Sequence, residues 1–370
     1  MLRTASAFWG LFWKAAPKPP KNFEAPSAFF SPSPTANHKK IMRLVLCYPV
    51  SQKHIDQIQQ TVPEWEVVDA GQEGVAKELF DADFFCGHAK VPVDWEGVVK
   101  QGRLQWVQSS AAGMDHCLTP AVIDSEIIVT SASGVLSDQV TEHAIALITG
   151  WTRSMPRFYT AHEKREFIRL PTTDLTRKTV GIVGFGGVGR RLARVLAAFD
   201  CRILATDLFP ENQPAYVDQL LPETELHTML PQCDVVILCA PLNASTYQMI
   251  GKEELAAMQT TALLANMARG SLVDTDALVA ALNDGVIAGT VMDVTDPEPL
   301  PPEHPLWETP QTIITPHVAG QSGWRIDRMT EMYCQNLVRW QQGKKLINQL
   351  DEKALGFPKR DGKTPLWIEE

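Results

Sequence analysis

A glycine-rich turn between an apolar run and a helix-forming run restricts the fold of this chain more than any other feature. Residues 179–183 read Thr-Val-Gly-Ile-Val, and Gly184, Gly186 and Gly189 follow in the spacing G-x-G-x-x-G. Gly184 permits the tight turn, Gly186 lets a phosphate approach the backbone, and Gly189 lets a helix pack closely on the strand. Residues 190–198, Arg-Arg-Leu-Ala-Arg-Val-Leu-Ala-Ala, supply that helix. The motif predicts a parallel α/β domain that binds a dinucleotide at this turn.

A carboxylate ends the strand that is expected after this helix. Residues 202–206 read Arg-Ile-Leu-Ala-Thr, and Asp207 follows them. A carboxylate about 20 residues beyond the glycine turn accepts hydrogen bonds from the adenosine ribose and repels a 2′-phosphate. Asp207 therefore predicts NAD(H) rather than NADP(H) as the cofactor.

Short apolar runs separated by helix-forming stretches extend on both sides of the turn, which is typical of parallel sheets. Before the turn, strands are expected at 43–47, 66–69, 83–86, 104–107 and 127–130, with a helix at 51–60. From the turn onward, strands are expected at 180–184, 202–206, 234–239, 261–265, 288–293 and 312–315, and helices at 188–198, 252–258 and 274–284. Gly285 lies where the last of these helices needs a C-terminal cap.

Two further helices are predicted outside these series. The apolar stretch 140–151 predicts a long helix that links two domains, with Ser137 or Asp138 as its N-cap. In residues 326–340 the apolar side chains follow each other at steps of three or four, which predicts one apolar helix face. A single terminal helix cannot bury that face alone, so we expect it to pack on the first domain. Residues beyond 345 are expected to form a polar tail.

The first forty residues differ in kind from the rest of the chain. They hold six Lys and Arg residues against one Glu, together with six prolines and no sustained period. Three interpretations remain open: a disordered tail, a transit-like targeting segment, or translation from a start codon upstream of the true one. Met42 directly precedes the first expected strand.

The composition argues against several classes of protein. A net charge of −9, from 34 Lys and Arg against 43 Asp and Glu, argues against binding nucleic acid through bulk charge. No apolar run approaches the ~20 residues of a membrane span. The seven cysteines form no C-x-x-C pair, so zinc-site spacing is absent and no metal is expected. Three of them, Cys201, Cys233 and Cys239, flank or lie in apolar runs, which predicts buried thiols in a reducing compartment, the cytoplasm.

Three expected strand ends carry Arg269, Glu298 and His317. In open parallel sheets ligands bind beyond the carboxyl ends of the strands, so we expect one crevice to hold all three beside the cofactor. Arg269 can pair bidentately with a substrate carboxylate. His317 can give or take a proton near neutral pH, and a carboxylate on its other ring nitrogen favours the protonated form. Asp296 and Glu303 are alternatives to Glu298 for that carboxylate. This set of side chains suits hydride transfer to or from a 2-keto acid.

Four segments together resemble the D-isomer-specific 2-hydroxyacid dehydrogenase family, over roughly residues 43–345. They are Gly184–Gly189, Asn266–Asp274, Asp293–Pro301 and Thr315–Gly320. The resemblance implies an α/β fold of two Rossmann-like, doubly wound parallel-sheet domains, with the cofactor domain inserted into the substrate domain. The parts implied are a substrate domain at 41–139, an NAD-binding domain at 140–318, a return helix at 319–345 and the tail at 346–370. Hinges are expected near 136–141 and 319–321, and a homodimer contact at 140–151.

The resemblance also implies roles for individual residues. Arg269 would bind substrate, His317 would be the acid and base, and Glu298 would be its partner. The cofactor-binding residues implied are Gly184, Gly186, Gly187, Val188, Gly189, Asp207, Cys239, Ala240, Pro241, Met267, Ala268, Arg269, Asp293 and His317. The substrate-binding residues implied, on loops at 86–90 and 109–115 and after the later strand, are Ala89, Lys90, Ala112, Gly113 and Arg269.

Some positions depart from the family pattern or have no clear role. Cys239 stands where the family often has a histidine, and Gly187 where many members carry a longer side chain. His88 and His116 are interpreted as loop side chains, while Lys90 would tune selectivity for a larger or doubly charged substrate.

The resemblance implies an NAD(H)-dependent enzyme that interconverts small 2-keto acids and D-2-hydroxy acids, with glyoxylate or hydroxypyruvate as the expected substrate. One alternative is a phosphoglycerate dehydrogenase-like enzyme for a bulkier acid, for which Lys90, Arg103 or Arg325 would supply extra positive charge. Another is an NADH-sensing dimeric binding protein on the same scaffold.

Overall fold

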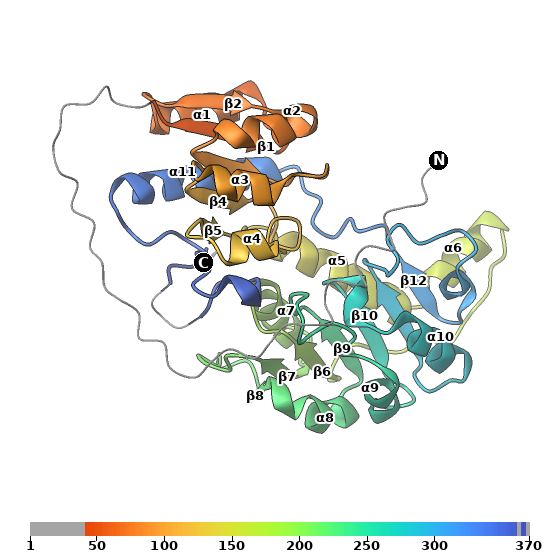
Figure 1. The fold of residues 1–370 in the computed structure, drawn as a ribbon. Helices are drawn as coiled ribbons and strands as arrows, with labels where there is room; N and C mark the ends of the chain where they lie inside the picture. The colour runs from red at the N-terminus through yellow and green to blue at the C-terminus, as the bar shows by residue number, and fades with distance from the viewer. Residues whose placement is uncertain (1–40, 361–363, 368–370) are drawn as a thin grey trace. The chain divides into compact units, whose positions relative to one another are not determined.

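The computed structural model describes residues 41–360 and 364–367. Its first sheet has five parallel strands in the order β2-β1-β3-β4-β5 (Figure 1). The strands are β1 Arg43–Cys47, β2 Glu66–Asp69, β3 Phe84–Gly87, β4 Trp106–Ser109 and β5 Ile128–Thr130. All five were expected from the sequence, with β4 beginning two residues later than predicted.

The second sheet has seven parallel strands in the order β12-β11-β10-β9-β6-β7-β8. The strands are β6 Thr179–Val183, β7 Arg202–Asp207, β8 Gln219–Pro222, β9 Val235–Leu238, β10 Leu263–Asn266, β11 Gly289–Met292 and β12 Thr312–Ile314. Only β8 was not predicted. It lies at the edge of the sheet with both ends exposed, so its sequence lacks the apolar run that marks a buried strand.

Helices connect the parallel strands of both sheets. Their bounds are α1 Gln52–Thr61, α2 Gly71–Glu78, α3 Trp95–Gln101, α4 Pro120–Ile123, α5 Ser137–Thr152, α6 Met155–Glu163, α7 Gly187–Ala197, α8 Leu226–Met229, α9 Lys252–Ala257, α10 Thr275–Asn283 and α11 Arg325–Gln341. Gly285 follows α10 with φ +67°, and the N–H of Val286 bonds to the carbonyl of Ala281 at 2.8 Å. That pattern closes a helix C-terminus and confirms the predicted cap.

Each sheet buries both of its faces. In β1, Leu44 and Leu46 belong to one apolar cluster, whereas Val45 belongs to a second cluster on the other side. Successive strand residues point to opposite faces, so apolar side chains are needed on every position of such a strand. The expected fold class, two α/β domains built on parallel sheets, is confirmed.

The start of α5 differs from the prediction. Ser137 and Asp138 lie inside the helix, and Leu136 is the N-cap residue without a side-chain cap. Asp138 instead pairs with Arg191 of α7, with 2.5 Å between Oδ1 and Nε, and with Arg328 of α11. The Asp138 carboxylate therefore forms ion pairs with two other helices and does not cap the N-terminus of α5.

Helix α11 packs on the first sheet, as its apolar face predicted. Tyr333 and Leu337 are fully buried in a cluster with Phe84 and Trp106 of the sheet. The rings of Trp340 and Trp106 stack at 5.8 Å between centroids. Helix α11 therefore belongs to the same domain as strands β1 to β5.

The segment after α11 is not the polar tail that was expected. Leu346, Ile347 and Leu350 are buried, and Gln349 forms an antiparallel bridge with Thr130 at the end of β5. Residues 361–363 and 368–370 lie outside the described residues. The interpretations of residues 1–40 also fall outside them.

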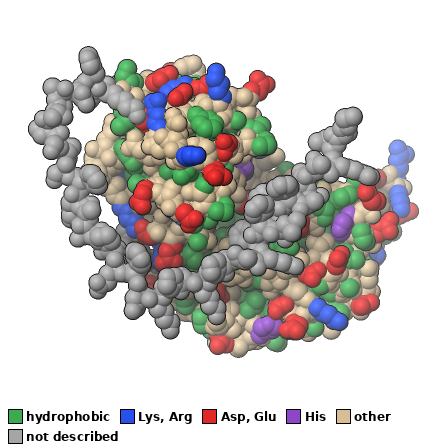
Figure 2. Space-filling model, viewed as in Figure 1, with side chains coloured by type: hydrophobic (Ala, Val, Ile, Leu, Met, Phe, Trp, Pro, Cys, Tyr) green, Lys and Arg blue, Asp and Glu red, His purple; other side chains and the backbone are tan. Residues whose placement is uncertain are grey.

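Two further findings on the described residues concern membrane-spanning helices and clusters of metal ligands. None of their helices is long and apolar enough to cross a membrane. No group of three or more His, Cys, Asp or Glu side chains in this part of the chain is placed to hold a metal ion. Figure 2 shows acidic and basic side chains interspersed on the face that it draws.

Candidate active site

The predicted cofactor residues follow the carboxyl ends of neighbouring strands in the second sheet. Beginning with β7 and moving to β12, the strand ends carry Asp207, the glycine turn at 184–189, residues 239–241, residues 267–269, Asp293 and His317. Because all seven strands are parallel, these ends share one edge. Ligands of open parallel sheets bind at that edge.

The glycine turn has the geometry that a phosphate-binding turn requires. Gly184 has φ +92°, and a Cβ on it would lie 2.6 Å from the backbone nitrogen of Ala240. A Cβ on Gly189 would lie 2.3 Å from the carbonyl oxygen of Gly184, whereas one on Gly186 would meet nothing within 4 Å. Gly186 therefore faces open space at the N-terminus of α7, and the turn fits the pyrophosphate of a dinucleotide.

Gly187 is explained by the segment that packs on it. A Cβ there would lie 2.9 Å from Oγ of Ser137 and 3.1 Å from Cα of Gly134. The close approach of Ser137 and Gly134 leaves no room for a side chain at this position. Oγ of Ser137 is buried and has no hydrogen-bond partner among the described residues, so a polar group is available beside the turn.

Asp207 joins the glycine turn to the loop after β7. Its Oδ2 accepts a hydrogen bond from the N–H of Phe185 at 2.6 Å, and its Oδ1 accepts one from the N–H of Phe209 at 2.8 Å. Each carboxylate oxygen keeps a second lone pair. Asp207 is therefore fixed in direction while still able to accept from a ribose hydroxyl.

His317 and Glu298 meet as an ordered pair. Nδ1 of His317 lies 2.7 Å from Oε1 of Glu298, and both side chains are a little over two-fifths exposed. Partial burial raises the pKa of Glu298, but its hydrogen bond to His317 and the charges of His317 and Arg269 together hold that pKa below its usual value. The Glu298 contact leaves Nε2 of His317 as the ring nitrogen that is free to meet a substrate.

The other two carboxylates near Glu298 are placed elsewhere. Oδ2 of Asp296 accepts a hydrogen bond from the hydroxyl of Ser271 at 2.6 Å. Glu303 is exposed. The structure therefore brings Glu298, of the three candidates, to the histidine.

Asp293 organises the segment that carries His317. It is 2% exposed and accepts hydrogen bonds from the N–H groups of Val318 at 2.9 Å and Ala319 at 2.8 Å. The hydroxyl of Thr315 donates to it at 2.6 Å. The carboxylate thus fixes the backbone on both sides of the histidine, and its expected part in binding the cofactor stays a prediction.

Arg269 lies between the second sheet and the loop after β4. Its Nη1 donates to the carbonyl of Ala268 at 2.7 Å, and its Nη2 lies 3.2 Å from Oδ1 of Asp115. A Cβ on Gly113 would fall 1.8 Å from Nη2, so a larger residue there would displace the guanidinium from its present position. Arg269 and the predicted substrate loop therefore lie in direct contact.

Comparison with known proteins places these residues in a family. Residues 145–319 match the family described as D-isomer specific 2-hydroxyacid dehydrogenase, NAD binding domain. The glyoxylate reductase of Thermofilum pendens is 34% identical over 279 residues, which are 72% of this chain and 80% of that protein. This chain belongs to the D-isomer specific 2-hydroxyacid dehydrogenase family. It is an enzyme of that family with an NAD(P)-binding domain.

Solved structures agree with the assignment to these dehydrogenases. A protein of Thermus thermophilus is 30% identical with a TM-score of 0.68, over 82% of this chain and 98% of that one. The NADPH-dependent glyoxylate/hydroxypyruvate reductase of Sinorhizobium meliloti, in complex with NADP and malonate, is 27% identical with a TM-score of 0.68. That comparison covers 86% of this chain and 99% of the other.

The two loops that are expected to bind substrate hold two stacked imidazoles. The rings of His88 and His116 lie 3.9 Å apart and nearly parallel, at 19°. Burial, followed by the neighbouring His88, lowers the pKa of His116 to about 3 although Asp115 opposes the shift. Ala89 is buried beside them, whereas Lys90 is exposed. Both imidazoles are therefore neutral at neutral pH, since burial also lowers the pKa of His88.

The sequence did not indicate the role of three residues in this region. Asp115 was expected only as the last residue of a loop and Ser137 only as a helix cap, and no role was predicted for His143. Nε2 of His143 lies 2.9 Å from Oγ1 of Thr315 and 3.3 Å from Oδ1 of Asp293. No local pattern marks such residues, because their partners lie far away along the chain.

Proposed function

We propose that this dehydrogenase reduces a small 2-keto acid, glyoxylate or hydroxypyruvate, to the D-2-hydroxy acid and catalyses the reverse oxidation. The contact of 2.7 Å between His317, which follows β12, and Glu298, which follows β11, carries the proposal. Strand β11 lies between β12 and β10, the strand that precedes Arg269. The names of the relatives support it, because the protein of T. pendens is a glyoxylate reductase and that of S. meliloti acts on glyoxylate and hydroxypyruvate.

In the proposed mechanism Arg269 holds the substrate. Its planar guanidinium pairs with the carboxylate of the acid and directs the adjacent carbonyl toward His317. Backbone N–H groups near Ala112, Gly113 and Ala89 would hold the same carboxylate. The N–H of Lys90 already donates to Oε1 of Gln72 at 2.7 Å. Asp115 keeps the guanidinium in the cleft until substrate arrives.

His317 moves the proton. In reduction, Nε2 of the protonated imidazole gives its proton to the carbonyl oxygen, and in oxidation the neutral ring takes it back from the hydroxyl. Glu298 at Nδ1 fixes the tautomer and stabilises the protonated ring. When bound, the reduced nicotinamide supplies the hydride for the carbonyl carbon.

We assign the cofactor to residues 140–318 and the substrate to residues 41–139 and 319–345, with hinges near 136–141 and 319–321. The glycine turn and the strand ends from Asp207 to His317 would hold the dinucleotide. Asp207 favours NAD(H), because its carboxylate accepts from the ribose hydroxyls and repels a 2′-phosphate.

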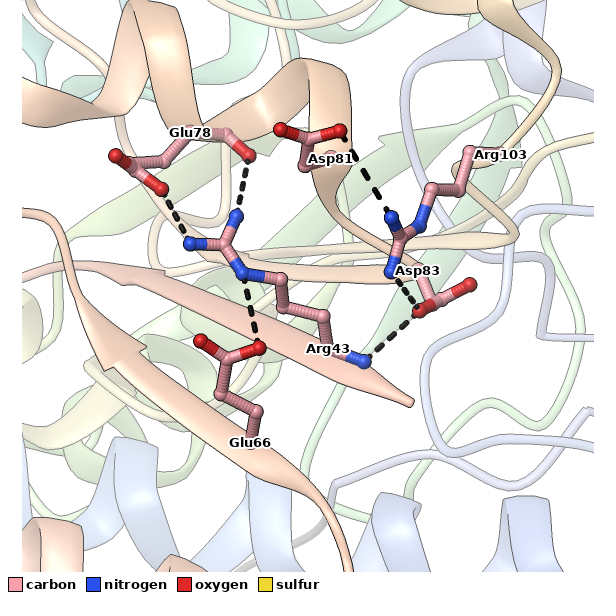
Figure 3. Close-up of polar contacts among 6 residues, drawn as sticks. All are labelled: Arg43, Glu66, Glu78, Asp81, Asp83 and Arg103. Atoms are coloured by element: carbon pink, nitrogen blue, oxygen red, sulfur yellow. Dashed lines mark hydrogen bonds and ion pairs between the residues drawn. The ribbon is translucent and has the colours of Figure 1, made fainter. Parts of the chain in front are cut away.

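The surroundings of the substrate loops bear on the size of the acid. Arg103 does not reach them: its Nη2 lies 3.0 Å from Oδ2 of Asp83, which also accepts from the N–H of Arg43 at the amino end of β1 (Figure 3). The charges of Lys90 and Arg325 do act on His88. These two cations favour the second candidate, a bulkier acid with another negative charge.

The test is the loss of NADH absorbance with a panel of 2-keto acids. The panel holds glyoxylate, hydroxypyruvate, pyruvate, a branched 2-keto acid and phosphohydroxypyruvate. Fast turnover with one of the first two supports the proposal, and preference for the phosphorylated acid favours the second candidate. Binding of NADH without turnover on any member would overturn both and support a sensor of NADH.

Two further predictions accompany the proposal. A homodimer with contact at α5 is expected, and size-exclusion chromatography with light scattering measures it. A cytoplasmic location is expected from the buried thiols, and fractionation of cells checks it.

A further inference from the structure

The segment at 353–360 is anchored to the first domain by a lysine. Nζ of Lys353 donates hydrogen bonds to the carbonyl oxygens of Val122 at 2.7 Å and Ile127 at 3.2 Å, and also to that of Ser125. Three carbonyl acceptors satisfy all three donors of an ammonium group. The start of the segment is therefore held at the carbonyls between α4 and β5.

The same segment then contacts the second domain on both sides of the expected adenosine site. Nδ2 of Asn243, just beyond the predicted cofactor residues 239–241, donates to the carbonyl of Leu355 at 3.3 Å. The ring of Phe357 lies 6.2 Å from that of Phe209, two residues after Asp207. Nζ of Lys359 lies 5.4 Å from the centroid of the Phe209 ring. Residues 355–359 therefore lie against the loops that follow β7 and β9.

Two arginines belong to the segments that meet at the loop after β7. The guanidinium of Arg190, the first residue after the glycine turn, lies 4.5 Å from the centroid of the Phe185 ring. Its two Nη atoms donate to the carbonyls of Glu211 and Asn212, each at 2.9 Å, which holds it over the loop after β7. Arg360 directly follows Lys359. Burial, followed by the charge of Arg190, lowers the pKa of Arg360 to about 10, although Asp207 opposes the shift.

The charges around Asp207 do not balance. The charges of Arg190 and Arg360 both act on the carboxylate of Asp207. The oxygens of that carboxylate already accept hydrogen bonds from the N–H groups of Phe185 and Phe209. Like charges that are partly withdrawn from water repel each other, and an anion placed between them relieves that repulsion. The 2′ position of adenosine lies beside a carboxylate at this strand end.

We propose that residues 353–360 form part of the cofactor site, and that Arg360 with Arg190 binds the 2′-phosphate of NADP(H) beside Asp207. Asp207 alone would restrict the enzyme to NAD(H), whereas the two arginines offset its charge, so that both cofactors are used. The inference rests on the dinucleotide site of the proposed function but not on the identity of the keto acid.

The experiment measures binding of adenosine fragments, without any keto acid, by isothermal titration calorimetry. The two ligands are 5′-AMP and 2′,5′-ADP, which differ only in the 2′-phosphate. The unaltered enzyme is expected to bind 2′,5′-ADP at least about tenfold more tightly, as charge-assisted contacts to a phosphate require. The variant Arg360→Ala is expected to lose about that factor for 2′,5′-ADP and to bind 5′-AMP within about twofold of the original. The variant Arg360→Lys is expected to retain part of the preference.

Lys344→Ala removes an exposed cation from the loop after α11 and serves as the matched control, with both affinities unchanged. Equal binding of the two fragments by the unaltered enzyme would overturn the inference. An equal loss of affinity for 5′-AMP and 2′,5′-ADP in Arg360→Ala would also overturn it, because the segment would then contact the adenosine and not the 2′-phosphate. Since no substrate is present, a failure of the keto acid panel leaves this result standing, and the converse also holds.

Discussion

Nη2 of Arg269 lies 3.2 Å from Oδ1 of Asp115, which joins the end of β10 to the loop after β4. The two side chains come from different sheets and are separated by 154 residues of sequence. Both are partly exposed, with 27% and 38% of their side-chain surfaces accessible. Solvent therefore screens the pair, so its importance lies in the direction that it gives the guanidinium more than in stability.

Replacing Asp115 by Asn is expected to weaken substrate binding. Without the carboxylate, the Arg269 fork loses its orientation toward the cleft, and we expect kcat/KM for the keto acid to fall roughly tenfold, mainly through KM. Steady-state kinetics at saturating cofactor measure the change. Glu96→Gln, an exposed acid on α3, should leave both constants unchanged, and a similar loss in that variant would contradict the role given to Asp115.

Replacing Glu298 by Gln is expected to lower kcat about 100-fold, because the carboxylate that orients and stabilises protonated His317 is lost. Steady-state kinetics with the keto acid and saturating cofactor measure the change. Glu303→Gln provides the control on the same loop, and an unchanged kcat in Glu298→Gln would rule out the pairing of roles.

Replacing Gly186 by Ala is expected to separate cofactor binding from folding. An added Cβ meets nothing in the protein within 4 Å, and its φ is negative, so the melting temperature of the free enzyme should stay the same. The methyl group would instead occupy the approach of the pyrophosphate, and NADH affinity should fall at least about tenfold. Gly74→Ala, in α2, makes only ordinary contacts and should change neither quantity.

The buried imidazole of His116 is expected to make the fold sensitive to acid. Burial, followed by His88, lowers its pKa to about 3 in the folded state, whereas an unfolded histidine titrates near 6.5. Below pH 6.5 the unfolded chain therefore binds a proton that the folded chain does not, so stability falls as the pH drops. By linkage the loss at pH 5 reaches at most about 2 kcal/mol.

Denaturant unfolding of His116→Gln at pH 7 and pH 5 measures this loss of stability. The difference in the free energy of unfolding between pH 7 and pH 5 should be smaller in this variant than in the original enzyme. It should be unchanged in His162→Gln, whose side chain is exposed on α6. Equal differences in all three proteins would show that His116 does not titrate as described.

Packing of α11 is expected to hold the first domain together. Leu337 is fully buried against the sheet, so Leu337→Ala should lower the free energy of unfolding by about 2–5 kcal/mol. Val338, the next residue, is 40% exposed, and Val338→Ala should cost no more than about 0.5 kcal/mol. Urea denaturation compares them, and similar losses would mean that the helix does not form the core as described.

Local patterns in the sequence predicted most of the elements. Buried strands such as Arg43–Cys47 are continuous apolar runs, and Gly285 supplies a backbone conformation that few residues adopt. The edge strand Gln219–Pro222 has no such run, because its ends are exposed. The segment 346–350 resembled a tail because its few apolar residues are buried by partners far away in the chain.

The sequence by itself determined the α/β fold class and the glycine turn, and it predicted Arg269, Glu298 and His317 as site residues. Each of these depends on residue type and on spacing over a short stretch of chain. Only the tertiary structure decided which of three carboxylates meets His317, that Asp115 contacts Arg269, and that residues 355–359 lie against the loop after β7. Such contacts join residues that are far apart in the sequence and that packing brings together. A local sequence pattern does not indicate which distant residues will be neighbours in space.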